Sequence, residues 1–212
     1  SSLEDEGLGI VSSSQGEVYI TGYFKGTSMF GNTSITSSAQ EDIFIAKYTT
    51  SGSLNSVIKA SGDRTDRANG IALYGNDLYI TGYFNSINCQ FGNLTSNNTN
   101  NIGGSSEAFV AKYNSSNLNS IWVQKSSGGG NESSNSISVD ANSVYFTGLY
   151  SHGNPTFGST TLNQYGTFGD ADIFVSKLDA GGNFVWAKQF GCVDNSPLLK
   201  ISIQVDEEQN VY

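Results

Sequence analysis

The heptapeptide LYITGYF, from Leu78 to Phe84, occurs in three variants along the chain. VYITGYF spans Val18 to Phe24, and VYFTGLY spans Val144 to Tyr150. Each variant is rich in β-branched and aromatic residues and lies between turn-forming residues, which predicts a β-strand. A strand that returns at long, regular intervals indicates a repeat architecture.

Other blocks recur around the heptapeptide in a constant order. The block DIFIAKY (Asp42–Tyr48) returns as EAFVAKY (Glu107–Tyr113) and as DIFVSKL (Asp172–Leu178). No stretch sustains an apolar period of 3.6 residues, so no helix is predicted. Each repeat then carries four strands, which in the second repeat are predicted at Ile71–Tyr74, Leu78–Phe84, Ala108–Tyr113 and Ile121–Lys125.

The strands carry apolar or aromatic residues on both of their faces, as in IFIAKY and VYITGY. This pattern favours a sheet packed on both sides, as in a β-propeller blade between two neighbours, whereas a β-sandwich sheet shows one polar face. We therefore predict an all-β, β-propeller-type repeat array built of four-stranded blades of about 60–67 residues.

The repeats divide the chain into a lead-in at 1–8, full blades at 9–69, 70–135 and 136–199, and the start of a fourth blade at 200–212. Propellers usually close a ring with at least four blades. The chain is therefore expected to continue beyond Tyr212 or to be completed by another chain.

The pattern N-x-[VL]-Y-[IF]-T-G, then F-G, then [DE]-[IA]-F-[IV]-[AS]-K, a tight turn and a final Gly resembles the bacterial β-propeller repeat often called SBBP. The resemblance covers about Gly9 to Tyr212 and departs at Val57, where the other copies have Trp122 and Trp186. It implies a secreted or surface-exposed bacterial protein and supplies no catalytic motif.

The composition excludes two classes of partner. Lys and Arg total 10 against 19 Asp and Glu, a net charge of −9, which disfavours nucleic acid because its binding relies on basic residues. No apolar run approaches the roughly 20 residues of a membrane span.

Only 14% of residues are charged, which is typical of secreted β-proteins, so a secreted, extracellular or bacterial cell-surface location is expected. Two buried or free thiols at Cys89 and Cys192 are favoured over a disulfide.

Long connections between strands are the expected recognition sites, because loops on a rigid scaffold commonly carry function. The longest are Lys25–Glu41, Asn85–Ser106 and Ser151–Ala171, all on the face opposite the tight turns; the alternative is that they are tolerated surface insertions. The candidate ligand-binding residues on this face are Asp63, Asp66, Phe91, His152 and Phe157. Each loop Phe is interpreted as an anchor for its loop, with sugar stacking as the alternative.

Calcium is the one cofactor considered, since hard cations bind several oxygen ligands. Asp170 and Asp172 are the candidate ligands, although no loop has EF-hand spacing. Asp172 also recurs as Asp42 and Glu107, and for this set we favour carboxylates that cap backbone N–H groups of the neighbouring loop. The recurring Gly22, Gly82 and Gly148 are interpreted as a bulge or close approach that serves packing on the next blade.

No motif of an enzyme is present: GxSxG, HExxH, P-loop and GxGxxG patterns do not occur, and His152 is the only histidine. We therefore predict a binding module rather than an enzyme, acting in adhesion to carbohydrate or protein at the cell surface. One alternative is a structural subunit of a surface layer or fibre, whose partners are further copies of itself. Another is a non-catalytic segment of a secreted hydrolase.

Overall fold

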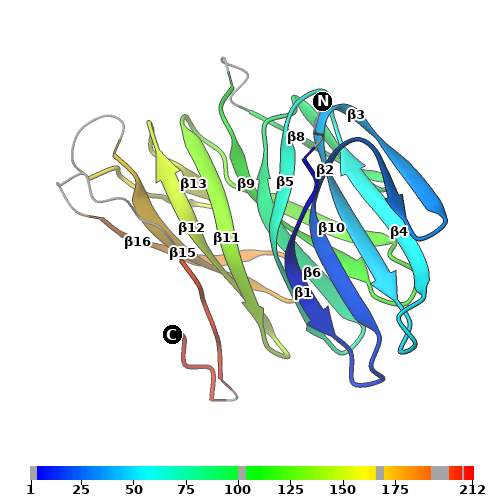
Figure 1. Ribbon diagram of the computed structural model, residues 1–212. Coiled ribbons are helices and arrows are strands. Elements are labelled where there is room, and N and C mark those ends of the chain that lie inside the picture. Colours follow the sequence, from blue (N-terminus) through cyan, green and yellow to red (C-terminus); the bar gives the residue numbers. More distant parts are fainter. Residues whose placement is uncertain (1–3, 100–103, 166–169, 192–200, 207) are drawn as a thin grey trace.

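The chain is all-β in the computed structural model, which describes residues 4–99, 104–165, 170–191, 201–206 and 208–212 (Figure 1). No helix occurs in these ranges, and hence none long and apolar enough to cross a membrane. The strands are β1 Glu6–Ser12, β2 Val18–Phe30, β3 Thr33–Tyr48, β4 Leu54–Ser61, β5 Asp66–Tyr74, β6 Asp77–Phe84, β7 Asn88–Phe91, β8 Leu94–Asn97, β9 Glu107–Asn114, β10 Ser120–Lys125, β11 Asn131–Val139, β12 Ser143–Ser151, β13 Thr156–Phe157, β14 Thr160–Thr161, β15 Asp172–Asp179 and β16 Phe184–Phe190.

Twelve of these strands form three antiparallel, four-stranded meanders: unit 1 (β1-β2-β3-β4), unit 2 (β5-β6-β9-β10) and unit 3 (β11-β12-β15-β16). The all-β prediction is confirmed, and the four strands predicted for the second repeat are all present. The first strands begin earlier than the predicted boundaries at 70 and 136, since β5 starts at Asp66 and β11 at Asn131.

The units pack face to face, with β1, β5 and β11 side by side (Figure 1). Unit 2 is buried on both faces: Leu78, Ile80 and Phe84 pack towards unit 1, whereas Tyr79 and Val110 pack towards unit 3. Alternating side chains of one strand therefore enter two different cores, which explains its apolar residues on both faces. Burial of each large apolar side chain contributes about 1.5–3 kcal/mol.

The recurring glycine of each second strand faces a β-bulge in the first strand of its own unit. A Cβ at Gly82 would lie 2.0 Å from the Arg67 carbonyl oxygen, and one at Gly148 would lie 2.0 Å from that of Ser133. No side chain fits there, so glycine is required. The close approach that the sequence predicts is thus present, but it lies within one sheet and does not serve contact with the next unit.

The long connections contain hairpins, which sequence patterns did not reveal. The β7–β8 hairpin of unit 2 pairs with the end of β4, so that the sheet of unit 1 becomes six-stranded. The β13–β14 hairpin of unit 3 makes a bridge between Thr156 and Ser127, just beyond β10 of unit 2. In unit 1 the same region continues β2 and β3 as a ribbon, and its tip, Gly26–Ser37, is named the first hairpin.

The final residues lie against β11 in the place that a further first strand would take (Figure 1). The N–H groups of Ile203 and Val205 donate to the hydroxyls of Ser136 and Ser138 at 3.1 and 3.0 Å. Val205 also bridges to Val211, as the start of a hairpin. The predicted boundary at Lys200 lies outside the described residues, and the start of a fourth repeat stays a prediction.

Candidate binding groove and the carboxylates around it

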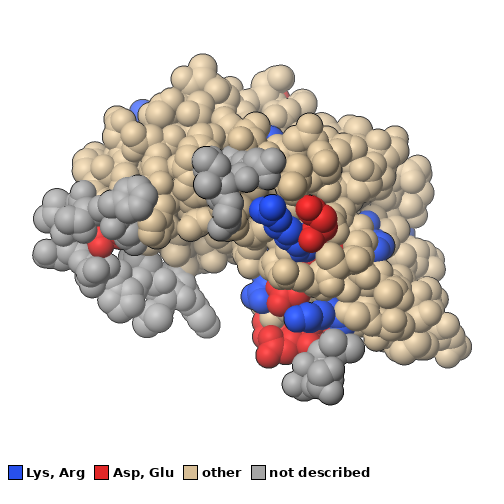
Figure 2. Space-filling model, turned by 90° about the horizontal axis from the view of Figure 1, so that it is seen from above, with Lys and Arg blue, Asp and Glu red and all other residues tan. Residues whose placement is uncertain are grey.

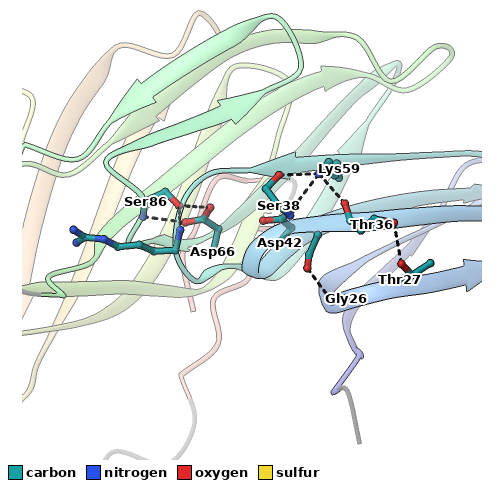
Figure 3. Close-up of polar contacts among 10 residues, drawn as sticks. Gly26, Thr27, Thr36, Ser38, Asp42, Lys59, Asp66 and Ser86 are labelled. Atoms are coloured by element: carbon teal, nitrogen blue, oxygen red, sulfur yellow. Dashed lines mark hydrogen bonds and ion pairs between the residues drawn. The ribbon is translucent and has the colours of Figure 1, made fainter. Parts of the chain in front are cut away.

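Asp66 and Asp63 hold the connection after β6 against the link between units 1 and 2. Asp66 is fully buried, and its Oδ1 accepts the N–H groups of Asn85 and Ser86, both at 3.2 Å. Its Oδ2 accepts the Ser86 hydroxyl at 2.7 Å (Figure 3). Asp63 Oδ1 accepts the N–H of Ile87 at 2.9 Å. Burial raises the pKa of Asp66 to about 6, although the hydrogen bonds from Ser86 act to lower it.

Cys89 lies next to this carboxylate and is fully buried, without a disulfide to any described residue. Burial raises the pKa of its thiol well above the ordinary value, and the charge of Asp66 raises it further. Such a thiol is a poor nucleophile at neutral pH. Cys192 lies outside the described residues, so the prediction about pairing of the two cysteines remains a prediction.

The recurring acids Asp42, Glu107 and Asp172 each cap a backbone N–H group of the segment that precedes them, as expected. Each is fully buried. The contacts are Asp42 Oδ2 with Ser38 N at 2.7 Å, Glu107 Oε1 with Thr99 N at 2.6 Å, and Asp172 Oδ2 with Tyr165 N at 2.6 Å. A charged acceptor on a backbone donor makes a strong hydrogen bond, so these residues fix where each long connection returns to its sheet.

A lysine accompanies this acid in units 1 and 2, whereas none pairs with it among the described residues of unit 3. Lys59 Nζ lies 3.3 Å from Asp42, and Lys125 Nζ contacts Glu107. The strand register puts Gln189 in the corresponding place of unit 3. Its amide instead makes two hydrogen bonds with the backbone of Asn163, at 2.8 and 2.7 Å.

The predicted calcium ligands Asp170 and Asp172 are both buried, and Asp172 acts as the cap described above. No cluster of three or more His, Cys, Asp or Glu side chains that could hold a metal occurs among the described residues. Calcium takes six to eight oxygen ligands, and two carboxylates do not supply that set. Calcium binding therefore stays a prediction for this chain.

Phe91 and Phe157 are buried rather than displayed, with exposed fractions of 0% and 1%. The Phe91 ring lies 4.9 Å from that of Phe109, and the Phe157 ring lies 4.7 Å from that of Phe174. Phe30 stands at 4.9 Å from Phe44 in the same way. All three rings anchor a hairpin tip on the third strand of its unit, and a buried ring offers no face on which a sugar could stack.

His152 is exposed in a left-handed backbone conformation (φ 63°), and its Nδ1 lies 2.9 Å from the hydroxyl of Ser151. It directly follows β12 of unit 3, whereas Asp63 and Asp66 lie at the link between units 1 and 2. The structure therefore does not gather the five predicted ligand-binding residues into one site.

A second set of carboxylates recurs ahead of the bulge of each first strand and was missed by sequence reasoning, except for Asp66. Asp5 accepts the N–H of Lys25 at 3.1 Å, as Asp66 accepts that of Asn85. Glu132 is the third member. The sequence signal is faint, because the residue type changes from Asp to Glu and the connection that precedes the heptapeptide differs in length.

Glu132 lies in the junction of units 2 and 3 with an exposed fraction of 1%. Its Oε2 accepts the Ser126 hydroxyl at 3.1 Å, and its Oε1 has no hydrogen-bond partner among the described residues. Burial raises the pKa of Glu132 to about 8, with a further contribution from the charge of Glu107. The group is therefore neutral over much of the acidic and neutral pH range.

Arg67 joins units 1 and 2 at the end of the molecule where the long connections emerge. Its guanidinium donates twice to Glu41, at 2.5 and 2.9 Å, and lies 3.9 Å from the centre of the Tyr23 ring. The carboxylate raises the pKa of Arg67 further above its ordinary value. Seen from above, charged side chains gather around a notch in a surface that is otherwise mostly uncharged (Figure 2).

A groove of about 840 Å³ runs along the outer edge of units 1 and 2. The first hairpin and β4 form one side, and the β7–β8 turn with the β9–β10 turn forms the other. Apolar atoms come from Ile35, Val57, Ile58 and Leu118. Neutral polar groups come from Thr36, Asn93, Asn117, Asn119 and Ser120, and Lys59 is the one charged residue of the lining.

Lys59 fixes one wall of this groove (Figure 3). Its Nζ donates to the carbonyl of Thr36 at 2.8 Å, to the hydroxyl of Ser38 at 2.9 Å and to Asp42 at 3.3 Å. On the other wall the Ser120 hydroxyl donates to Asn93 at 2.6 Å. The groove is thus preformed, and its only cation is already paired.

A scan against protein-family models finds no match for the chain, and a search of curated proteins finds none. The function has to follow from the geometry of the chain itself.

Proposed function

We propose that the chain is a non-catalytic binding module of a secreted or cell-surface bacterial protein, and that it recognises carbohydrate in the groove between units 1 and 2. The observation that carries the proposal is the groove itself: an apolar floor, a rim of side-chain amides and hydroxyls, and one neutralised cation. We further propose that the three units are blades of a propeller-type array, since they are four-stranded meanders packed face to face.

The chemistry of the lining favours a neutral, polyhydroxylated ligand. A sugar ring has apolar C–H faces, which fit against Ile35 and Val57, and a periphery of hydroxyls that both donate and accept. The amides of Asn117 and Asn119 can also do both. Binding sites commonly combine an apolar lining with a few placed polar groups, and the paired Lys59 gives no preference for an anion.

The groove differs in part from the predicted long-loop face, because the tight β9–β10 turn lines it together with the tips of long connections. The tips of two long connections line it, through Ile35 and Thr36 of the first hairpin and Asn93 of the β7–β8 turn. His152 and Phe157 belong to unit 3 and do not line it. Protein binding in the same groove is the alternative, and it would replace sugar hydroxyls by backbone groups of the partner.

Glycan-array screening of the whole chain, followed by calorimetry on the best ligand, tests this proposal. The Asn119 side chain is exposed on the rim, so Asn119→Ala is expected to weaken binding about fivefold without unfolding the protein, since one hydrogen bond contributes about 1 kcal/mol. Asn55→Ala is the matched control, because Asn55 is an exposed residue of β4 that does not line the groove. The proposal fails if no glycan binds, or if both variants bind as the native chain does.

A structural role through contacts between copies is the second candidate. One observation favours it: Phe190 on β16, the last strand of unit 3, is an apolar residue with an exposed fraction of 58%. Exposed apolar side chains on an edge strand are unusual in proteins that stay apart.

A further inference from the structure

The two internal junctions use the same contact between a hairpin and a strand edge. In the first, β7 pairs with the end of β4, and in the second an isolated bridge joins β13 to Ser127, just beyond the end of β10. Gln90 and Thr156 both directly precede the Phe of a Phe-Gly pair. Each pairs with a serine that occupies the same position in its repeat. The partners are Phe91 with Ala60, Gln90 with Ser61, and Thr156 with Ser127.

The junctions also share a polar contact at the tight-turn end. Lys47 Nζ donates to the carbonyl of Ser115 in unit 2 at 3.1 Å, and Lys112 Nζ donates to that of Ala180 in unit 3 at 3.5 Å. Each lysine lies 5.4 Å from the ring of the tyrosine on its neighbouring strand. The acceptor is in each case the turn between the third and fourth strands of the next unit.

Unit 1 presents the hairpin side of such a junction, which we call the donor half. No strand among the described residues pairs with it. The Phe30 ring sits 4.9 Å from Phe44, the same spacing as Phe91 from Phe109 in the paired hairpin. The first hairpin is therefore already in the conformation that pairs elsewhere. Met29, which occupies the place of Gln90, has an exposed fraction of 65%.

Unit 3 presents the strand-edge side of such a junction, which we call the acceptor half. The register puts Phe190 opposite Ile173, as Ala60 is opposite Ile43, so Phe190 occupies the place of a residue that pairs with a hairpin in unit 1. Lys177 lies 4.9 Å from the Tyr145 ring, in the arrangement of the other two lysines. Strand β16 has no strand beyond it in the described sheet.

We propose that these halves meet between two copies of the chain, head to tail. The first hairpin of one copy adds to β16 of the other, with Phe30 opposite Phe190 and Met29 opposite Gly191, and Lys177 donates to the carbonyl of Thr50. Strand addition at an exposed edge supplies main-chain hydrogen bonds, and the apolar side chains add burial. Because donor and acceptor are different surfaces, the contact is heterologous and propagates into rings or filaments.

Residues 201–206 and 208–212 lie over the inner part of the same face of unit 3, where β1 and β2 of the second copy would come. Two hydrogen bonds to Ser136 and Ser138 hold Ile203 and Val205 of this segment, and Tyr212 has an exposed fraction of 75%. Docking therefore displaces this segment. Amide hydrogen exchange at Ile203 and Val205 is expected to quicken when copies associate.

Sedimentation of three chains tests the junction. The native chain is expected to rise above its 22.5 kDa mass with concentration. Met29→Asp removes the donor and Phe190→Asp removes the acceptor, each by placing a charge on an exposed position, so each variant alone is expected to stay monomeric. A 1:1 mixture retains one intact donor and one intact acceptor, and it is expected to form a dimer that grows no further.

Val185→Asp is the matched control, since Val185 is an equally exposed apolar residue of β16 outside the pairing positions, and it is expected to associate as the native chain does. A native chain that is monomeric up to millimolar concentration overturns the proposal. So does a Met29→Asp or Phe190→Asp variant that still assembles, or a mixture that stays monomeric. None of these positions lines the groove between units 1 and 2, so the outcome is independent of glycan binding.

Discussion

The two junctions share a scaffold but differ in their polar chemistry. At the junction of units 1 and 2, Arg67 and Glu41 form a two-fold hydrogen-bonded ion pair. At the junction of units 2 and 3, the position that corresponds to Arg67 is occupied by Ser133, and the position that corresponds to Glu41 is occupied by Ser106. The polar groups of this junction are instead a neutral hydrogen bond and a buried acid. The Asn69 amide donates to the Ser134 carbonyl at 2.8 Å, and the acid is Glu132.

The difference shows which features the repeat holds constant. The apolar cores, the glycine at each bulge and the ring at each hairpin tip recur, whereas the polar residues between units vary. The cores therefore supply the bulk of the cohesion, and the polar groups set how each junction responds to pH and salt. Five substitutions, two in the apolar cores and three at polar groups, separate these contributions.

The largest effect is expected from removing a core ring in either junction. Phe109 and Phe174 are both fully buried and occupy equivalent places in the two cores. Phe109→Ala and Phe174→Ala are each expected to lower the free energy of unfolding by about 3–5 kcal/mol, through lost burial and a cavity. Urea denaturation measures both. A clearly smaller loss for one of them would show that its junction does not depend on its core.

Glu132 should make the second junction sensitive to pH. Its carboxyl titrates near 4.5 when unfolded and near 8 when folded, so between these values the unfolded chain releases a proton that the folded chain keeps. The contribution of Glu132 to the free energy of unfolding is therefore fully present below about pH 4.5. It is lost as the pH rises to about 8. Glu132→Gln removes this fall and is expected to stabilise the protein by about 2–4 kcal/mol at pH 9 relative to its effect at pH 4.

Thermal unfolding at pH 4, 6 and 9 measures this effect. Asp5→Asn is the matched control, because Asp5 is the exposed member of the same set of carboxylates and should leave the pH profile nearly unchanged. A Glu132→Gln profile that runs parallel to the native one would mean that Glu132 is charged in the folded state.

Arg67→Ala breaks the ion pair that distinguishes the first junction. It is expected to lower the free energy of unfolding by about 1–2 kcal/mol, since the pair is partly exposed and the guanidinium also stacks on Tyr23. Raising the salt concentration should shrink the difference by screening. Arg64→Ala, which removes a nearby cation without a side-chain ion pair among the described residues, should have little effect. An Arg67→Ala loss unchanged by salt would assign the stabilisation to stacking alone.

The strands and the repeat could be predicted from the sequence, because alternating apolar residues in LYITGYF and EAFVAKY report directly on two buried faces. The role of Asp42, Glu107 and Asp172 as caps was also predicted, because an acid at one fixed place in every repeat favours a structural role over calcium binding. Phe91 and Phe157 were correctly expected to anchor their loops.

The candidate groove was not predictable, because it depends on how units meet rather than on any local pattern. The β7–β8 hairpin contains short strands among Asn, Ser and Thr residues, and only its pairing with Ala60 on another unit defines it. The burial of Glu132 likewise depends on Ser126 and Ser106 across the junction. Contacts between residues far apart in sequence leave no periodic signal in either partner.

Asn69→Ala gives the smallest expected effect and completes the comparison. It removes the neutral hydrogen bond to Ser134 and is expected to lower the free energy of unfolding by about 0.5–1.5 kcal/mol, the usual net contribution of one such bond. Because neither partner is charged, the loss should be the same at low and high salt, in contrast to Arg67→Ala. Urea denaturation at two salt concentrations measures this. A salt-dependent loss at Asn69 would mean that the two junctions are not electrostatically separate, since Asn69 lies two residues after Arg67 on the same strand, β5.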